Sequence, residues 1–298
     1  MTKFIKSLLL TALLFVAISC ANTPNSLDTL KVTIENQISK IDGDIAVAFL
    51  DLSDDNNQIL IHVDEQFHAA STMKVPVMIE LYKQQSEGKL NLNDSILLKN
   101  EFKSIVDGSI YKMDIGDDSD DVIYSKIGTK QKLFDLMYNM ITVSSNLATN
   151  VLIELVDAKK TTETMRSLGA SKIEVLRGVE DIKAYEKGLS NSTTANDLLV
   201  IMKAIANGTA GTKEDCEAML AILKDQKWND MIPLYLPEEV EVAHKTGSIT
   251  GVHHDAAIVY APNGKQYVLV LLSKNLKDFE KGTQQLAEIS KSVYDYMK

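Results

Sequence analysis

The order of hydrophobic patterns along this chain of 298 residues constrains its fold more than any other feature. Two β-type runs, IAVAFLDL (45–52) and QILIHV (58–63), lie near the beginning, and EVEVAHKTGS, AAIVYA and YVLVLLS follow Trp228. Between them, from about residue 90 to residue 225, the spacing of apolar residues is mostly helical. Strands from both ends of the chain can therefore join one antiparallel sheet, with the helical segment as an insertion.

Amphipathic stripes flank the strands at both ends of the chain. Residues 26–41 carry apolar residues at steps of three and four, and the last helical stretch carries Leu286, Ile289, Val293 and Tyr296. The predicted fold class is therefore α/β of the α+β type: an antiparallel sheet flanked by terminal helices, with a mostly helical second lobe inserted. We assign one domain to 27–298, with an α/β lobe at 27–70 and 228–298 and a helical lobe at 71–227.

The first residues have the pattern of an export signal. In MTKFIKSLLLTALLFVAISC, two lysines precede an apolar run from Leu8 to Ile18 that is too short to cross a membrane stably. The small Ser19 directly before Cys20 resembles a bacterial lipoprotein cleavage site. We expect a signal peptide at 1–19, a lipid on Cys20 and a tether at 20–26, on the periplasmic or cell-surface side of the envelope. The alternative is a plain signal peptide in which Cys20 has no role.

Composition excludes several classes of site and partner. The chain has 31 basic and 41 acidic residues, a net charge of −10, and no basic cluster, which argues against a nucleic-acid partner. Cys216 is the one cysteine beyond Cys20, so no internal disulfide or cysteine zinc cluster can form, and its position suits a packed helix face. The acidic stretch GDDSDD (116–121) lacks the full calcium-loop pattern and is interpreted as a solvated loop. We expect no metal, no cofactor and a monomer.

One short stretch, HAASTMKVPVM (68–78), carries a candidate nucleophile. Its S-x-x-K pattern also occurs at 86–89 and 109–112, so the spacing alone decides nothing. Only Ser71 lies at a predicted helix start, where backbone N–H groups can stabilise an oxyanion. Lys74 lies one turn further on, in mostly apolar surroundings. Because burial lowers the pKa of a lysine, Lys74 can act there as a base.

Two further stretches complete a signature. MITVSSNLATN holds S-S-N at 144–146, and VAHKTGSITG holds K-T-G at 245–247 on a predicted strand. With S-x-x-K before them, these motifs resemble the signature of class A β-lactamases and penicillin-recognising serine hydrolases. The resemblance covers essentially everything after the tether. Ser145 departs from it, because the family has an aspartate there with a mainly structural role.

The resemblance implies a catalytic role for each matching residue. Ser71 would attack the carbonyl carbon of a β-lactam or an acyl-D-alanine-like peptide and form an acyl-enzyme, while Lys74 takes or relays its proton. Ser144 would pass a proton to the departing nitrogen, beside Lys245. The residues implied in substrate binding are Asn146 for a side-chain amide, Thr246 with Lys245 for the carboxylate, the backbone N–H groups of Ser71 and Ser248 for the oxyanion, and Gly247 for an open strand edge.

The loop LRGVEDIKAYE (176–186) departs from the family pattern. Class A β-lactamases carry a glutamate two residues after an arginine, which activates the hydrolytic water, and an asparagine four residues later. Here Glu180 lies three residues after Arg177, and Ala184 takes the place of the asparagine. Asn150 matches a position that supports the family's glutamate. We predict Glu180 as the water-activating base, with Asp181 and Glu186 as the other candidates.

The predicted function is a serine β-lactamase of class A type, acting through a Ser71 acyl-enzyme without a cofactor. The alternative is a cell-wall D-Ala-D-Ala peptidase or penicillin-binding serine hydrolase with slow deacylation. A third hypothesis is a catalytically silent lipoprotein that binds wall peptides, against which the presence of Lys74 argues. The expected partner is a small β-lactam or D-Ala-D-Ala-like peptide, and the expected membrane contact is the lipid anchor alone.

Overall fold

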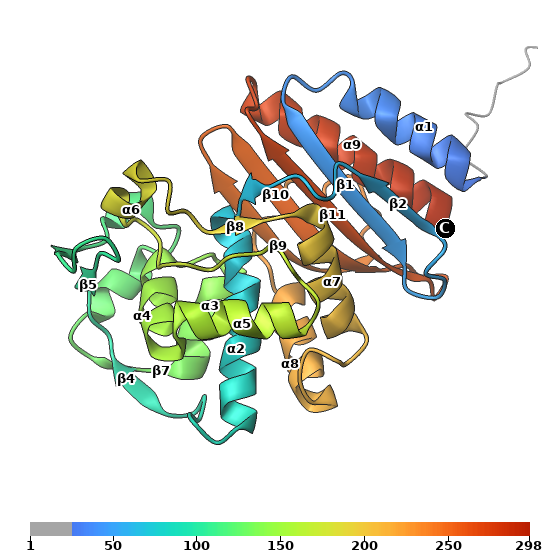
Figure 1. Cartoon of the computed structure of the whole chain (residues 1–298). Helices are drawn as coiled ribbons and strands as arrows, with labels where there is room; N and C mark the ends of the chain where they lie inside the picture. The colour runs from blue at the N-terminus through green and yellow to red at the C-terminus, as the bar shows by residue number, and fades with distance from the viewer. Residues whose placement is uncertain (1–25) are drawn as a thin grey trace, which may run out of the picture.

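The computed structural model describes residues 26–298. The predicted signal peptide, Cys20 and all but the last residue of the tether lie outside the described residues. Figure 1 shows a sheet covered by helices on one side of the molecule and a group of helices around α2 on the other. Among the described residues no helix has the length and apolar character needed to cross a membrane.

The sheet contains five strands, all antiparallel, in the order β2-β1-β11-β10-β9. The strands are β1 (Asp44–Asp51), β2 (Gln58–Ile61), β9 (Glu241–Ile249), β10 (Val252–Tyr260) and β11 (Gln266–Lys274). Strands from the two ends of the chain meet at the β1–β11 pair, where Val47 lies opposite Leu271. This confirms the predicted antiparallel sheet. In β11 the residues between the two ends are buried without alternation, because helices cover both faces of the sheet.

The terminal helices cover one face of the sheet, as predicted. In Figure 1, α1 (Leu27–Ile38) and α9 (Phe279–Met297) lie side by side over that face, where Val47 and Phe49 of β1 point into a shared core. The opposite face carries small residues of β1, Ala46 and Ala48, and packs against α7 (Ala195–Ala206). Helix α8 (Lys213–Lys224), with the buried Cys216, packs beside β9. Both α7 and α8 belong to the segment assigned from sequence to the helical lobe.

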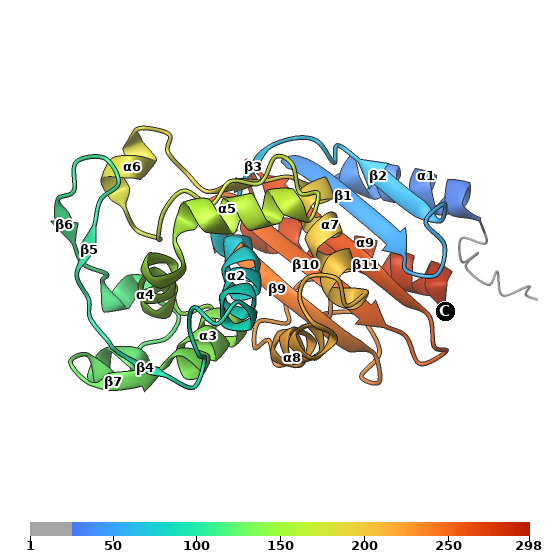
Figure 2. The ribbon, with the colours of Figure 1, turned by 60° about the horizontal axis from the view of Figure 1, so that its bottom comes forward.

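Helix α2 (Lys74–Ser86) forms the centre of the helical lobe. Figures 1 and 2 show it between α3 (Leu133–Thr142), α4 (Asn146–Val156) and α5 (Ala158–Ser167), and it contacts all three. Ten of its 13 residues are buried, as expected for a helix surrounded by others. Pro76 lies in its first turn, where a missing N–H costs least.

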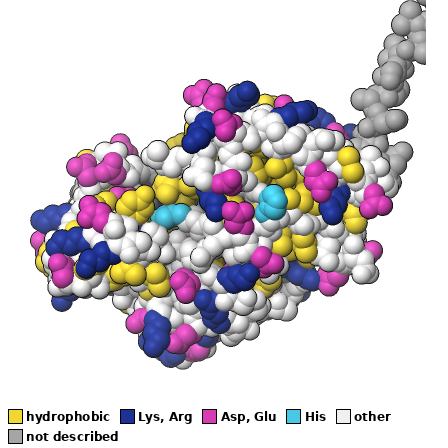
Figure 3. Space-filling model, turned by 45° about the horizontal axis from the view of Figure 1, so that its top comes forward, with side chains coloured by type: hydrophobic (Ala, Val, Ile, Leu, Met, Phe, Trp, Pro, Cys, Tyr) yellow, Lys and Arg dark blue, Asp and Glu magenta, His cyan; other side chains and the backbone are white. Residues whose placement is uncertain are grey.

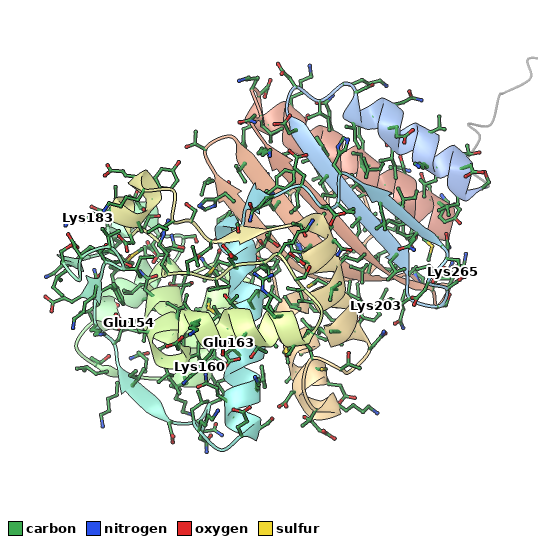
Figure 4. All side chains as sticks on the ribbon, viewed as in Figure 1. Glu154, Lys160, Glu163, Lys183, Lys203 and Lys265 are labelled. Atoms are coloured by element: carbon green, nitrogen blue, oxygen red, sulfur yellow. The ribbon has the colours of Figure 1, made fainter. Side chains whose placement is uncertain are left out.

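Short elements fix the loops around these helices. They are β3 (Phe67–His68), β4 (Ser95–Leu97), β5 (Phe102–Lys103), β6 (Ile110–Tyr111), β7 (Lys130–Lys132), β8 (Ser192–Thr193), α6 (Ile182–Glu186) and the 3-10 turns η1 (Ala70–Met73), η2 (Ile115–Asp117) and η3 (Val122–Lys126). The β3–β8 pair ties the segment before Ser71 to the end of the 176–191 loop. Lys183, labelled on α6 in Figure 4, donates hydrogen bonds of 2.8 Å to Asp107 and Ser109. The 176–191 loop is thus attached at more than one point.

Acidic and basic side chains are interspersed on the surface. Figure 3 shows both signs mixed over one face, with apolar side chains between them. Most ion pairs join exposed residues, such as Lys99 with Glu154, and pairs of that kind contribute little stability. The net acidity is therefore spread over this face and does not form a single-sign field on it.

Candidate active site

The candidate nucleophile, Ser71, lies in the 3-10 turn η1 and not in the first turn of an α-helix. The prediction of a helix start at Ser71 is thus correct in place but not in type, since α2 begins only at Lys74. The backbone N–H of Ala70 donates to His68 Nδ1 at 3.0 Å, which fixes the turn from the side of β3. Ser71 is half-buried and lines a cavity between the two lobes.

The backbone of the site is held in conformations that L-residues seldom adopt. Among the described residues six other than glycine have a positive φ. Three of these line this cavity or the neighbouring one that also contains Ser71: Ala70 at 45°, Ser144 at 62° and Glu180 at 60°. Such residues cost free energy and persist where the surrounding structure determines them, often at functional sites. The clustering supports a functional interpretation of this cavity.

Lys74 lies fully buried beneath the cavity. Its Nζ donates hydrogen bonds to the Ser144 carbonyl at 2.8 Å, to Asn146 Oδ1 at 2.8 Å and to Ser144 Oγ at 3.1 Å. Burial lowers its pKa to about 7, although the nearby carboxylates of Asp118 and Glu180 act in the opposite direction. A lysine with this pKa is present in substantial part as the neutral amine at neutral pH, and the neutral amine is the form that accepts a proton.

Lys245 on β9 approaches the same hydroxyl from the sheet. Its Nζ donates to Ser144 Oγ at 3.1 Å and to the Thr246 carbonyl at 2.8 Å, and it is fully buried. Burial, together with the charge of Lys74, lowers the pKa of Lys245 well below its ordinary value, while Asp255 acts in the opposite direction. The Ser144 hydroxyl thus lies between two lysine nitrogens at equal distances.

Gly247 allows β9 to approach the nucleophile. A Cβ atom at Gly247 would lie 3.0 Å from the backbone nitrogens of both Ser71 and Thr72. Any side chain there would push the strand away from η1. The glycine of K-T-G therefore permits a direct backbone contact between the sheet and the turn that carries Ser71.

One cavity brings the motif residues together. With a volume of about 330 Å³, it is lined by Ser71 from η1, Ser144 and Asn146 from the start of α4, and Thr246, Gly247 and Ser248 from β9. A second cavity, of about 490 Å³, shares Ser71, Asn146 and Ser248 and extends along the 176–191 loop, where Glu180 lines it. The three motifs, far apart in sequence, therefore face a common space.

Comparison with protein families agrees with this geometry. A model of the β-lactamase enzyme family matches residues 29–297, nearly all of the described chain. The chain belongs to the β-lactamase enzyme family. Its curated relatives include a β-lactamase of Bacillus licheniformis, 25% identical over 80% of this chain and 74% of the relative, and one of Proteus vulgaris, 27% identical over 80% of this chain and 86% of the relative.

Solved structures of β-lactamases and of a related protein have the same fold. A β-lactamase of Sphaerobacter thermophilus is 26% identical with a TM-score of 0.75, covering 91% of this chain and 95% of that one. The protein PBP-A is 24% identical with a TM-score of 0.75, covering 89% of this chain and 94% of that one. The resemblance found in the sequence motifs, and with it the fold class, is confirmed.

In this β-lactamase family member the 176–191 loop is attached through Asn150. The Asn150 side chain accepts a hydrogen bond from the Val179 N–H at 2.6 Å and donates one to the Val179 carbonyl at 2.9 Å. A Cβ atom at Gly178 would lie 2.4 Å from Asn150 Oδ1, so only glycine fits before the attached residue. The residue that Asn150 holds is therefore Val179, two residues after Arg177, and not Glu180.

The three acidic candidates of this loop have different surroundings. Glu180 is half-buried and lines the second cavity, and burial, followed by the charge of Asp117, raises the pKa of its carboxyl. The Asp181 carboxylate is buried and accepts hydrogen bonds from Ser104 Oγ and from the N–H groups of Ile105 and Ala184. Glu186 is exposed and lines neither cavity. Glu180 is thus the candidate with a carboxylate directed to the cavity and not engaged elsewhere.

The interpretation of 116–121 as a solvated loop is wrong for several of its residues. Asp118 accepts hydrogen bonds of 2.8 Å from the backbone N–H groups of Asn146 and Leu147, and Ser119 Oγ donates to the Ser144 carbonyl at 3.1 Å. The buried Asp120 accepts a hydrogen bond from Asn139. Sequence reasoning missed these contacts because they join residues 19 to 29 positions apart, and no motif marks them.

Sequence reasoning also missed one side of the first cavity. Trp228, Asp230, His253 and Phe279 line it opposite the helical lobe. The ring of His253 stacks on Phe279 with 4.8 Å between centroids, and its Nδ1 lies 2.7 Å from Thr283 Oγ1. These residues come from a loop, a strand and the start of α9, and none belongs to the three motifs.

Proposed function

We propose that this chain is a serine β-lactamase of class A type that hydrolyses the β-lactam amide through an acyl-enzyme on Ser71. The observation that carries the proposal is the Ser144 hydroxyl, held 3.1 Å from both Lys74 Nζ and Lys245 Nζ at the edge of the Ser71 cavity. A general base and a proton relay within hydrogen-bond reach of each other are the parts that acyl transfer requires.

Acylation would proceed in two steps: attack of Ser71 on the lactam carbonyl carbon, and cleavage of the lactam carbon–nitrogen bond. Neutral Lys74 takes the proton of the Ser71 hydroxyl, and Ser71 Oγ attacks the lactam carbonyl carbon. The backbone N–H groups of Ser71 and Ser248 would stabilise the resulting oxyanion. When the carbon–nitrogen bond breaks, Ser144 gives its proton to the nitrogen and is reprotonated from the lysine pair. Thr246 and Lys245 would bind the substrate carboxylate, and Asn146 would bind the side-chain amide.

Deacylation would use Glu180 as the base for water. Burial raises the pKa of Glu180 above that of an ordinary glutamate, which makes its carboxylate a stronger base for a water proton. Water attacks the acyl carbon, the ester bond to Ser71 Oγ breaks, and Ser71 recovers its proton. The position of Glu180 along the second cavity, which also includes Ser71, supports this role.

A second candidate function is a penicillin-binding serine hydrolase or D-Ala-D-Ala peptidase. The observation in its favour is that Asn150 holds Val179, two positions after Arg177. In class A β-lactamases the water-activating glutamate has that position, and here an apolar residue occupies it. With water poorly activated, a β-lactam adduct on Ser71 would persist. A variant of PBP-A has been solved as an acyl-enzyme complex with penicillin G.

A time course with a chromogenic cephalosporin, followed by intact-mass spectrometry, distinguishes the two functions. A β-lactamase gives sustained turnover that Ser71→Ala abolishes. One equivalent of product followed by a stable adduct supports the penicillin-binding hydrolase. If neither product nor adduct forms, both functions are wrong, and a binding protein for wall peptides becomes the better hypothesis.

We further propose that the protein is exported and attached to the bacterial envelope by a lipid on Cys20, as a monomer with no nucleic-acid partner. The N-terminal sequence pattern supports export and the lipid, and the net charge of −10 without a basic cluster supports the lack of a nucleic-acid partner. Cys20 lies outside the described residues. Cys20→Ala should transfer the full chain from the membrane fraction to the soluble fraction. If the variant stays in the membrane fraction, the lipid anchor is wrong.

A further inference from the structure

The helix that begins with the second motif, α4, lacks the aspartate that family members carry after the serine. Its N-cap residue Ser145 supplies one side-chain contact, accepting a long hydrogen bond of 3.3 Å from the Ala148 N–H. The first N–H groups of a helix have no partner within the helix and need acceptors from outside. In S-S-N the local sequence alone therefore leaves the start of α4 weakly capped.

A carboxylate from the 116–121 loop supplies the missing acceptors. One oxygen of Asp118 accepts from the Asn146 N–H and the other from the Leu147 N–H, both at 2.8 Å. Tyr124 donates to the same carboxylate at 3.1 Å and fixes it from the opposite side. Asp118 lies 28 residues before Asn146, so this cap comes from a separate segment. A carboxylate at a helix N-terminus is also favoured by the helix dipole.

We propose that Asp118 performs the structural role of the absent S-D-N aspartate and is a positioning residue for Ser144 and Asn146. This inference rests on the proposed function, because it concerns the residues assigned to proton transfer and substrate binding.

Neighbouring contacts of the loop act on the same two residues. Ser119 Oγ donates to the Ser144 carbonyl at 3.1 Å, on the residue whose φ is 62°. Asn146 Nδ2 donates to the Asp117 carbonyl at 3.0 Å, which leaves Oδ1 to accept from Lys74 at 2.8 Å. The loop thus fixes both the backbone of Ser144 and the orientation of the Asn146 amide. Displacing it would disturb every hydrogen bond that Lys74 makes.

Asp118 also contributes to the charge balance at Lys74. The charged groups around Lys74 are Asp118 on the loop, Glu180 on the opposite wall and Lys245 on β9. The two carboxylates raise the pKa of Lys74 against the effect of burial, which lowers it to about 7. Removing the charge of Asp118 would lower that pKa further. The neutral form of Lys74 would then persist to lower pH.

The test measures the rate of Ser71 acylation against pH in Asp118→Ala and Asp118→Asn, by rapid quenching and intact-mass spectrometry. Because small displacements of catalytic groups cost up to about 10²-fold in rate, we expect acylation to slow by about 10- to 100-fold. The acidic limb of the pH profile should move to lower pH in both variants. Asp121→Asn is the matched control: it removes the same charge from an exposed residue that makes no side-chain cap contact, and it should change neither quantity.

A second substitution tests whether Asp118 replaces the S-D-N aspartate. In the Asp118→Ala background, Ser145→Asp restores a carboxylate at the N-cap of α4. The acylation rate of this double variant should be about tenfold higher than that of Asp118→Ala alone. Wild-type acylation rates in Asp118→Ala, or no recovery in the double variant, would overturn the inference. A slower rate with an unmoved acidic limb would also overturn the link to Lys74, since general destabilisation does not move a pH profile. Absence of both turnover and adduct in the wild type would instead refute the proposed function.

Discussion

The two walls of the candidate active site differ in how firmly their functional groups are held. On one wall, Lys74 and Lys245 are fully buried, and each makes at least two hydrogen bonds with good geometry. On the other wall, Glu180 is half-buried, lies at a positive φ, and within residues 26–298 its carboxylate accepts no hydrogen bond. In the proposed mechanism, acylation therefore depends on groups fixed by two lobes, whereas deacylation depends on a single residue of a loop.

This difference separates the two chemical steps. The acylating wall joins η1, α4 and β9, so a change in any one of them affects the others through Ser144. The loop wall is attached through Asn150 to Val179 and through Asp181 to the 104–105 segment, and Glu180 lies between these attachments. Substitutions on the two walls should therefore have different kinetic signatures.

The largest effect is expected on the acylating wall. Lys74→Ala removes the proposed base and the donor to Ser144 and Asn146, and should slow acylation by about 10²- to 10⁴-fold. Single-turnover adduct formation measures this rate, and steady-state turnover should fall with it. If adduct forms at the wild-type rate, Lys74 is not the base.

Glu180→Gln should have the opposite effect to Lys74→Ala: it should slow deacylation and leave acylation nearly unchanged. Without a base for water, deacylation should slow by about 10²-fold or more, while acylation changes by no more than about threefold. The adduct should then accumulate in the mass spectrum. Val179→Glu is the matched variant, because it places a carboxylate on the residue that Asn150 holds, and it should restore deacylation in the Glu180→Gln background. Unchanged turnover in Glu180→Gln would show that another group activates the water.

The pH dependence should differ between the walls as well. The pKa of Lys74 is about 7, so the base form is lost below that pH and acylation should fall by about tenfold per pH unit in the acidic range. Deacylation should also decline in acid, as the carboxyl of Glu180, whose pKa is raised above that of an ordinary glutamate, takes up a proton. Separate pre-steady-state rates between pH 4 and pH 9, roughly the range spanned by these groups, test both limbs. A deacylation rate that does not fall in acid, or one whose acidic limb is unchanged in Glu180→Gln, would contradict the assignment of Glu180.

The smallest effect is expected away from both walls. Among residues 26–298 the buried hydroxyl of Tyr267 has no hydrogen-bond partner, although its ring packs edge-on against Phe49. Because a buried unpaired hydroxyl is unfavourable, Tyr267→Phe should raise the free energy of unfolding by about 1 kcal/mol. Denaturant unfolding measures this, and neither acylation nor deacylation should change. A change in either rate would mean that the sheet core is coupled to the site.

The sequence was sufficient to predict those parts of the molecule that local patterns encode. Alternating and helical periodicities predicted the antiparallel sheet and its terminal helices, and three motifs predicted which side chains of η1, α4 and β9 face one cavity. The contacts of Asp118 with the start of α4 could not be predicted, because a run of acidic residues has the same composition whether it is solvated or caps a distant helix. The attachment of Asn150 to Val179 depends on a loop conformation that includes the positive φ of Glu180, for which no local pattern exists.

Gly178 has a consequence for how this protein can change over time. A side chain at 178 would displace Asn150 Oδ1, which accepts the hydrogen bond from the Val179 N–H, so an acid placed there would weaken the attachment of the loop. Val179 and Glu180 are free of that restriction, since both positions already carry a side chain. The glycine therefore limits where on this loop a carboxylate can be placed, because positions 179 and 180 can carry a side chain and position 178 cannot do so without displacing Asn150.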